Sequence, residues 1–368
     1  TPKTDTGAAT YTLEGYEDAK MNTSVIGTLA NNANGLTSTD LIAEDCTDAA
    51  KYGLAQPKMT VDVTYESGSK TRFFIGDKAP SGDTYVMVDD GSRNVYTVQS
   101  SYLANYSKEL YDFVSSTILD TPADDNYPII NSLRIEREDL DYDIVLEYDE
   151  KSDDDGYTGG TSATHIMTEP TLAYISVERS TDITNGMFGL SSSGIYCVHC
   201  KDADMAAAGL AEPFCTVTMK CGDGNTYVLL LSEAFTDADH GSCCYAMLEG
   251  GNTIYIVKTD SVKWLTVMPV DIASRIFIGS YVWNVDTLSI TADGADTDFT
   301  VKRIDPDEDK SSLSASDFEV TKNGVRFDSE RYRQLYAFLI SAAAEDFAFD
   351  EDYPSGTPLI SLTYHDTY

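Results

Sequence analysis

Ala49-Ala-Lys-Tyr-Gly53-Leu-Ala-Gln-Pro57 and Met205-Ala-Ala-Ala-Gly209-Leu-Ala-Glu-Pro213 are two copies of one pattern. The copies are one offset apart, because 209 − 53 and 213 − 57 both give 156. In each copy an Ala-rich run ends at a glycine, which adopts the left-handed backbone conformation without a Cβ clash. The proline that follows prevents a helix from continuing. The pattern therefore predicts a helix that stops at Gly53 and again at Gly209, within an internal repeat.

Each copy is followed by a segment that predicts a β-hairpin. Polar and apolar residues alternate after Pro57, as expected for a strand with one buried face. Ser67-Gly68 predicts the turn, and residues 70–75 predict the returning strand. The apolar face of the first strand consists of Met59, Val61, Val63 and Tyr65.

The repeat continues beyond the hairpin. The matching segments are 85–88 with 245–248, 94–98 with 253–257, 133–135 with 288–290, and 142–146 with 299–301. Short strands joined by tight turns favour antiparallel pairing over parallel crossovers. The predicted fold class is therefore α+β, with tandem repeated units of mostly antiparallel sheet and flanking helices.

The repeat also predicts the domain organisation. A polar, proline-containing junction at 120–127 separates a first unit, residues 1–126, from a second unit, residues 127–285. Residues 286–368 form a partial third unit, because the strand-like segment after Pro358 resembles the one after Pro57. We expect this third unit to be cut off after one strand and the native chain to be longer.

Further elements follow from helical spacing and from capping residues. The predictions are a strand at 11–13, a short helix around 25–29 capped by Asn22 or Thr23, a helix-like segment from Ser100 or Ser101 to Val114, two short helices around Pro269, and a helix that begins near Asp328 or Ser329.

The composition is strongly acidic. There are 25 basic and 61 acidic residues, which gives a net charge of −36 and a pI near 4.1. Such a surface repels nucleic acid and anionic membranes, so binding to either through the bare surface is disfavoured and we expect no nucleic-acid partner. Solubility of an exposed protein explains the charge, and cation buffering or an acidic docking face are the alternatives. The hydrophobic content of 42% is sufficient for packed cores.

The seven cysteines leave three interpretations open. Cys197-Val-His199-Cys200 with Cys215 and Cys221 resembles a zinc-ligand set, but the spacing of the second pair differs from that of a zinc ribbon. Cys215 and Cys221 fall on the predicted apolar strand face, at the positions of Met59 and Tyr65 in the first copy, so we favour a buried core. One or two disulfides and a metal site are the alternatives. Adjacent cysteines at 243 and 244 are poorly placed to pair.

Calcium ligands are incomplete in both acidic loops. Around Asp153-Asp-Asp-Gly156, the first and twelfth loop positions are Lys151 and Ser162 rather than acids. In the second loop, 305–309, three acids alternate but no glycine follows, and Ser316 occupies the twelfth position. We predict that both loops are solvated and bind no metal.

Catalytic motifs are also incomplete. Residues 189–194, Gly-Leu-Ser-Ser-Ser-Gly, do not match Gly-x-Ser-x-Gly. None of the histidines lies in a motif with a nucleophile; they are His165, His199, His240 and His365. The paired carboxylates that glycoside hydrolysis requires cannot be recognised in this sequence, because acidic residues are so abundant that any pairing is possible. We predict no catalytic, cofactor-binding or metal-binding residue, and no cofactor.

Several of these motifs together resemble a known family. Tyr52-Gly-Leu-Ala-Gln-Pro57, the alternating strand, Phe73-Phe-Ile-Gly-Asp77, Tyr85-Val-Met-Val and Val95-Tyr-Thr-Val are similar to domain of unknown function 4340. The resemblance is best over residues 36–119. The second copy, about 195–280, departs from it, with Leu231-Ser-Glu233 in place of Ile-Gly-Asp. The family has no established catalytic residues.

The resemblance implies a bacterial extracytoplasmic protein, usually held by an N-terminal membrane segment, and some relatives are encoded beside ABC-type transporters of the gliding-motility kind. We therefore expect a non-enzymatic, membrane-tethered scaffold or binding module at the cell surface, accessory to an ABC-type transporter or to envelope assembly. Its partner would be a protein or an envelope polymer, and it would meet the membrane only through a missing N-terminal anchor. The alternative is a hydrolase that acts on envelope polymers or glycans.

Overall fold

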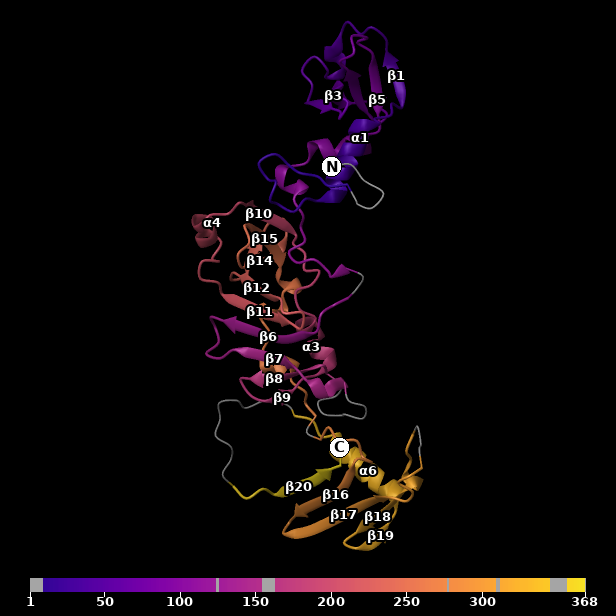
Figure 1. Ribbon diagram of the computed structural model, residues 1–368, viewed down its shortest axis with the longest axis vertical. Coiled ribbons are helices and arrows are strands. Elements are labelled where there is room, and N and C mark those ends of the chain that lie inside the picture. The colour runs from indigo at the N-terminus through magenta and orange to yellow at the C-terminus, as the bar shows by residue number, and fades with distance from the viewer. Residues whose placement is uncertain are drawn as a thin grey trace. The chain divides into compact units, whose positions relative to one another are not determined.

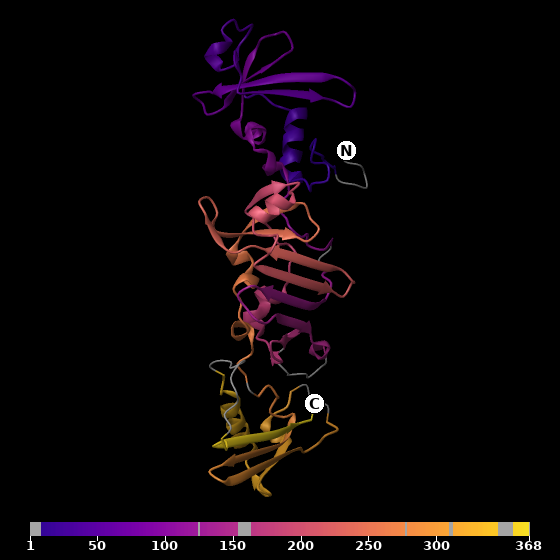
Figure 2. The ribbon, with the colours of Figure 1, turned by 90° about the vertical axis from the view of Figure 1, so that its left-hand side faces the viewer.

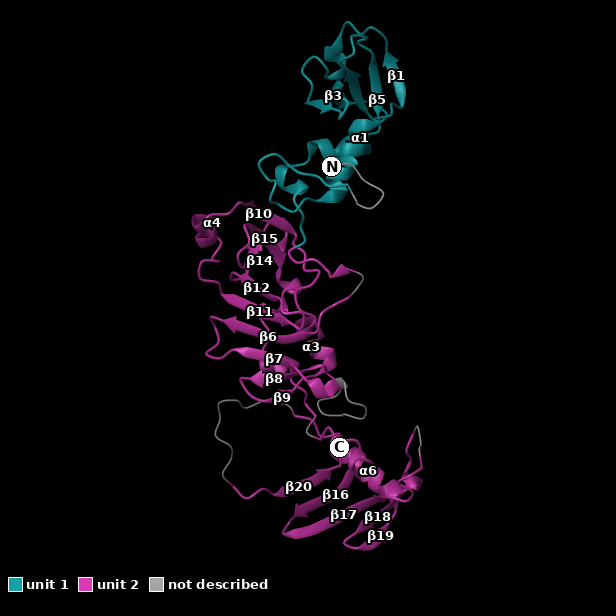
Figure 3. Cartoon of the chain, in the orientation of Figure 1, with its two compact units in different colours: residues 1–117 teal, residues 118–368 magenta. Residues whose placement is uncertain are grey.

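The chain divides into two compact units, residues 1–117 and residues 118–368 (Figure 3). The computed structural model describes residues 9–123, 126–153, 163–276, 278–308, 312–344 and 356–367. Three sheets carry most of the regular structure, and their neighbouring strands pair antiparallel (Figure 1). The prediction of mostly antiparallel sheet is thus confirmed, but helices are few, so the chain is mostly β rather than an even mixture of helix and sheet.

The first unit contains one five-stranded sheet, which is seen in the indigo-to-violet part of the ribbon in Figure 2. Its strands lie in the order β1-β5-β4-β3-β2. The predicted hairpin is confirmed, and the face with Met59, Val61 and Val63 is half-buried while the alternate residues are exposed. The predicted short helix is α1, Thr23–Asn34, and the Asn22 side chain caps it by accepting from the Val25 N–H at 3.3 Å. The strands are β1 (Asp40–Ala43), β2 (Met59–Thr64), β3 (Lys70–Lys78), β4 (Thr84–Val88) and β5 (Val95–Val98).

The glycine stop is confirmed in both copies. The 3-10 helix η1, Ala49–Tyr52, ends at Gly53 with φ 70°, and α4, Asp202–Ala207, is followed by Gly209 with φ 69°. The surroundings differ, since a Cβ added at Gly53 would lie 2.6 Å from the Asp77 carboxylate but at Gly209 would lie 3.7 Å from Ser232.

Two predictions for the first unit are wrong. Residues 11–13 are not a strand, because Tyr11 instead packs its ring over Gly27 of α1. The segment from 100 to 114 is not one helix. The Ser100 hydroxyl donates to the Gly82 carbonyl at 2.8 Å instead of capping, and the chain forms three short turns. These are α2 (Ser100–Leu103), η2 (Ala104–Ser107) and η3 (Leu110–Phe113).

The second unit begins with a ten-stranded sheet in the order β10-β15-β14-β12-β11-β6-β7-β8-β9, with β13 paired to β14. Its core lies between the sheet and short helices after β9 and β15, and Ile135, Val217 and Leu229 are fully buried in it. Where two short helices were predicted around Pro269, three short turns occur. The strands are β6 (Ile130–Arg137), β7 (Ile144–Tyr148), β8 (His165–Glu169), β9 (Ala173–Tyr174), β10 (Gly194–Val198), β11 (Cys215–Cys221), β12 (Thr226–Leu231), β13 (Phe235–Asp237), β14 (Gly241–Leu248) and β15 (Thr253–Lys258); the helices are η5 (Glu150–Asp153), α3 (Val177–Thr184), η7 (Thr259–Ser261), η8 (Lys263–Leu265) and α5 (Pro269–Ile272).

Half of this sheet has the connectivity of the first sheet. The order β10-β15-β14-β12-β11 corresponds strand by strand to β1-β5-β4-β3-β2. The registers also correspond, since Cys215 lies opposite Leu231 as Met59 lies opposite Ile75. A register shift interrupts β10 after Ile195, at the position where one interrupts β1.

The same unit contains a further five-stranded sheet in the order β19-β18-β17-β16-β20. The predicted helix is α6, Ser329–Ile340, and the Asp328 side chain caps it by accepting from the Arg331 N–H at 2.8 Å. Tyr332 and Tyr336 of α6 are buried against the sheet. The strands are β16 (Val285–Ala292), β17 (Ala295–Arg303), β18 (Phe318–Lys322), β19 (Val325–Phe327) and β20 (Ile360–Asp366), with the 3-10 helix η9 (Ala315–Asp317) before β18.

Candidate functional site

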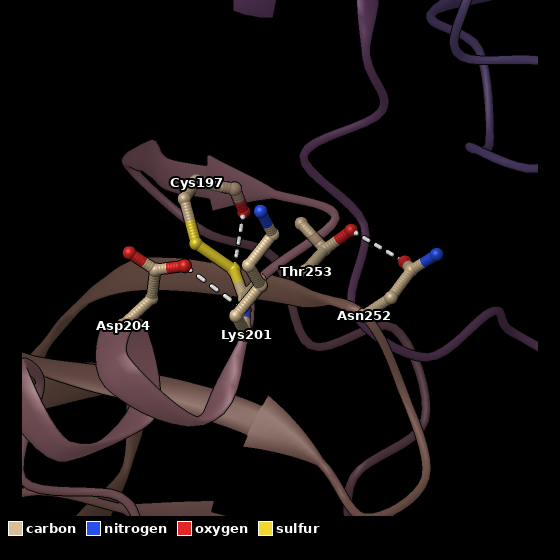
Figure 4. The surroundings of a disulfide bond; sticks show 6 residues. Cys197, Lys201, Asp204, Asn252 and Thr253 are labelled. Atoms are coloured by element: carbon tan, nitrogen blue, oxygen red, sulfur yellow. Dashed lines mark hydrogen bonds between the residues drawn. A yellow bond between two sulfur atoms is a disulfide. The ribbon is translucent and has the colours of Figure 1, made fainter.

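One disulfide, Cys197–Cys200, joins the end of β10 to the residues before α4 (Figure 4). The Asp204 side chain accepts from the Lys201 backbone N–H at 2.9 Å and so fixes the start of α4. Both cysteines pack on a small apolar cluster of β14, β15 and α4. The disulfide was one of the open alternatives for the cysteines, and the sequence spacing alone did not distinguish it from a metal site.

The first unit builds the same turn without a disulfide. Ala43 and Cys46 stand at the positions of Cys197 and Cys200, and Cys46 is a free thiol. The Cys46 N–H donates to the Arg93 backbone carbonyl at 3.0 Å, and the Cys200 N–H donates in the same way to the Asn252 carbonyl at 3.0 Å. The backbone of this turn therefore does not depend on the sulfur bridge.

The other cysteines of the second unit are buried free thiols. Burial raises the pKa of Cys215 and of Cys244 to about 12, and it also raises the pKa of Cys221 and Cys243. A thiol is nucleophilic as the thiolate, so these groups are unreactive while the chain is folded. The preferred interpretation of Cys215 and Cys221 as core residues is confirmed.

The described part of the chain brings no set of metal ligands together. Among the described residues, no three His, Cys, Asp or Glu side chains lie close enough together to hold a metal ion. The zinc alternative fails because Cys215 packs in the main core while Cys197 and Cys200 pack in the small cluster. Of the two calcium-candidate loops, residues 154–162 and 309–311 lie outside the described residues.

The histidines lie in different parts of the fold: His165 is in β8, His240 precedes β14 and His365 is in β20. The pKa of His165 is lowered because its ring is buried; Nε2 lies 2.8 Å from the Ile130 carbonyl and Nδ1 lies 2.9 Å from the Thr164 hydroxyl. With both ring nitrogens occupied, neutral His165 joins β8 to β6 and is not free to move a proton. His240 lies 2.7 Å from Asp237, and His365 lies 2.9 Å from Asp286.

Sequence reasoning missed a buried arginine at the end of β6 that pairs with an exposed aspartate. Arg137 is 8% exposed, and its guanidinium donates to both Asp139 oxygens, at 2.9 and 2.6 Å. It also donates to the Val267 carbonyl at 2.6 Å, which ties β6 to the segment after β15. The hydrogen bonds from Arg137 lower the pKa of Asp139. An arginine two residues before an aspartate is too common a spacing to have predicted this role.

An open cavity of about 800 Å³ with a mostly apolar wall lies between α6 and the segments that precede β16 and β18. Trp283, Tyr336 and Ile340 contribute much of the wall, and Glu330 and Arg333 lie at its rim. The Arg333 Nε donates to the Glu330 carboxylate at 3.0 Å, and this contact lowers the pKa of Glu330. A carboxylate held ionised by an arginine is a poor proton donor, so the cavity favours binding over acid catalysis.

Comparison with known proteins gives one match. Residues 12–169 match the family model described as Domain of unknown function (DUF4340). The resemblance drawn from the sequence is thereby confirmed over these residues. The DUF4340 match begins before α1 and ends with β8, so it includes the three strands β6, β7 and β8 that follow the first sheet in the chain.

Neither the curated proteins nor the solved structures contain a match to this chain. The description of the DUF4340 family assigns no chemistry, so chemical arguments rest on the residues themselves. In the part of the chain that the structure describes, no helix combines the length and the apolar character needed to cross a bilayer.

Proposed function

We propose that this chain is a non-enzymatic, extracytoplasmic scaffold or binding module built from tandem copies of one sheet unit. The observation that carries the proposal is the shared pairing of β1–β5 and β10–β15, including the register shift after Leu41 and after Ile195. Two segments that fold by the same pairing of the same positions fit duplication of one module. The division into units 1–126, 127–285 and 286–368 with flanking helices is part of this proposal.

The ionisable groups support a binding role. The shifted pKa values belong to buried core groups, such as Cys215 and Tyr332, and to local pairs, such as Asp139 with Arg137. Hydrolysis of a glycan usually needs two carboxylates on opposite sides of the bond. Among the described residues that line the cavity beside α6, Glu330 is the one carboxylate and it is paired with Arg333. The hydrolase alternative has no comparable support.

Location outside the cytoplasm is supported by chemistry and by the family. A disulfide such as Cys197–Cys200 persists in an oxidising compartment. The net charge of −36 keeps an exposed protein soluble and away from anionic lipid. We further propose, on the DUF4340 resemblance, an N-terminal membrane anchor and a role beside an ABC-type transporter or in envelope assembly.

Two measurements test the proposed function. Purified protein is incubated with isolated envelope polymers, and both cosedimentation and release of soluble fragments are measured; we expect binding or no interaction, but no release. Heat-sensitive release of fragments would overturn the non-enzymatic assignment. In native cells, the protein should be degraded by added protease after the outer layers are permeabilised while a cytosolic marker survives, and equal protection of both would contradict the location.

A further inference from the structure

A pocket of about 540 Å³, which we call the α3 pocket, lies where α3 ends, beside the first residues of β6 and β8 and the last residue of β7. The rings of Tyr127, Tyr148 and Phe188 contribute aromatic surface to its wall. Tyr127 is 50% exposed and meets Phe188 edge to face, with 6.0 Å between the ring centroids. The volume and the aromatic wall are those of a small-ligand site, for which roughly 300–1,000 Å³ is usual.

The polar groups of the α3 pocket carry no charge. Among the described residues that line it there is no Asp, Glu, Lys or Arg, although these types make up 23% of the chain. Asn185 lines the pocket directly after α3 and is exposed. Its side-chain amide can therefore both donate to a ligand and accept from one. The pocket thus offers ring faces and a neutral amide together.

A pocket occurs at the same place beside the third sheet. The seven pairs between β16 and β20 match the seven pairs between β6 and β11, with the register shift at the same place, so β16 corresponds to β6. α3 and α6 each follow the short strand that ends their sheet, and their N-caps are Ser176 and Asp328, an offset of 328 − 176 = 152. At this offset, three residues that line the α3 pocket correspond to three that line the cavity beside α6. They are Thr184 with Tyr336, Asn185 with Ala337, and Phe188 with Ile340.

Recurrence at equivalent positions indicates that the hollow is made by the sheet and helix of the module rather than by one loop. The two linings differ in chemistry. The cavity beside α6 has the Glu330–Arg333 pair at its rim, whereas the described lining of the α3 pocket is uncharged. The α3 pocket also has the Asn185 amide where α6 has the methyl group of Ala337. The ligand of each hollow is therefore set by its lining.

We propose that the α3 pocket binds a neutral saccharide, with the C–H face of a sugar ring on Tyr127 and its hydroxyls hydrogen-bonded to Asn185. The inference rests on the proposed binding function and names the ligand class and its site. A sugar ring suits this lining because it has an apolar face and an uncharged polar edge.

Other ligand classes fit the α3 pocket less well. An apolar ligand would bury the Asn185 amide without a partner, which costs free energy. A charged ligand of either sign finds no opposite charge in the described lining. An anion is also repelled by the net charge of −36.

The test uses the full chain and three neutral disaccharides, which are maltose, cellobiose and N,N′-diacetylchitobiose. Binding is measured by saturation-transfer NMR and by titration, and we expect at least one of the three to bind. Anionic digalacturonate should bind at least about tenfold more weakly than that sugar. Asn185→Ala should weaken binding of the sugar about fivefold, the loss expected for one hydrogen bond. An apolar ligand would lose no affinity with this change.

A matched pair of tyrosine variants tests the location. Tyr127→Ala removes the exposed ring and should weaken binding at least about tenfold. Tyr174→Ala, on β9 of the same sheet and outside the pocket, removes a ring of similar exposure, 43%, and should leave binding unchanged. Circular dichroism checks that each variant is folded.

Four results would overturn the proposal: binding of none of the three sugars, equal binding of digalacturonate, equal weakening by the two tyrosine variants, or unchanged affinity of Asn185→Ala. None of these results alters the cosedimentation and fragment-release test of the proposed function. Release of fragments would in turn overturn the non-enzymatic assignment without changing the affinity of the α3 pocket, so the two proposals fail separately.

Discussion

Ile135 of β6 and Ile290 of β16 form a matched pair for testing how the surrounding sheet sets stability. They are the same residue type at corresponding positions, since Ile135 lies opposite Val217 and Ile290 lies opposite Leu362. Ile135 is fully buried, whereas Ile290 is half-buried. The two sites differ chiefly in what covers the strand next to them.

Truncation of both isoleucines should separate the two sites. Ile135→Ala leaves a cavity in a closed core and should cost about 2–5 kcal/mol of the free energy of unfolding of the central sheet. Ile290→Ala removes a partly solvated side chain, so it should lower the stability of the third sheet by about 1 kcal/mol. The smaller effect follows because part of the Ile290 surface already contacts water.

Denaturant-dependent hydrogen exchange with mass spectrometry measures the two effects separately, because it reports the opening free energy of β6 and of β16 within one chain. Circular dichroism of both variants confirms that the fold is retained. Equal costs at the two sites, or a larger cost for Ile290→Ala, would refute the reasoning from burial.

Three further predictions concern the turns and one buried ring. Gly53→Ala and Gly209→Ala should each lower the free energy of unfolding by about 1 kcal/mol, because alanine is strained in the left-handed backbone conformation. Thermal melts should show a larger loss of stability for Gly53→Ala, because its added Cβ meets the Asp77 carboxylate. Equal losses for the two variants would contradict this reasoning. Replacing Cys197 and Cys200 by serine should lower the free energy of unfolding by about 2 kcal/mol, because the unfolded chain regains the entropy of the open loop. The circular dichroism spectrum should be unchanged. Loss of the sheet signal would instead show that the fold requires the disulfide. Burial holds the pKa of His165 below 6.5, so neutral His165 contributes its full stabilisation of the folded state above that pH, and this contribution declines as the pH falls below it. The urea midpoint of His165→Asn, measured against pH, should therefore lack this decline. Parallel pH profiles for the wild type and the variant would contradict the prediction.

The sequence predicted those parts of the fold that depend on local patterns. Alternation of polar and apolar residues after Pro57 sufficed for the β2–β3 hairpin, because one face of that hairpin meets the core and the other meets water. A glycine followed by a proline sufficed for the helix stop at Gly53. These signals are short-range and are written in consecutive residues.

Features that depend on distant residues could not be predicted. Residues 11–13 resemble a strand, but the Tyr11 ring packs against Gly27 of α1, which lies later in the chain. Arg137 is buried against the segment around Val267, whose carbonyl accepts from its guanidinium about 130 residues away in the chain. The cavity beside Trp283 combines α6 with residues before β16, and no spacing in the sequence records that arrangement.

Residue-resolved amide hydrogen exchange of β2, β11 and β20 tests the shared sheet module most directly. β11 is paired on both edges, so we expect protection at every amide from Cys215 to Cys221. Among the described strands, β2 pairs with β3 alone and β20 with β16 alone, so alternate amides of β2 and β20 should exchange rapidly. Continuous protection along β2 or β20, or alternating protection along β11, would contradict these strand pairings, and with them the sheet orders on which the correspondence rests.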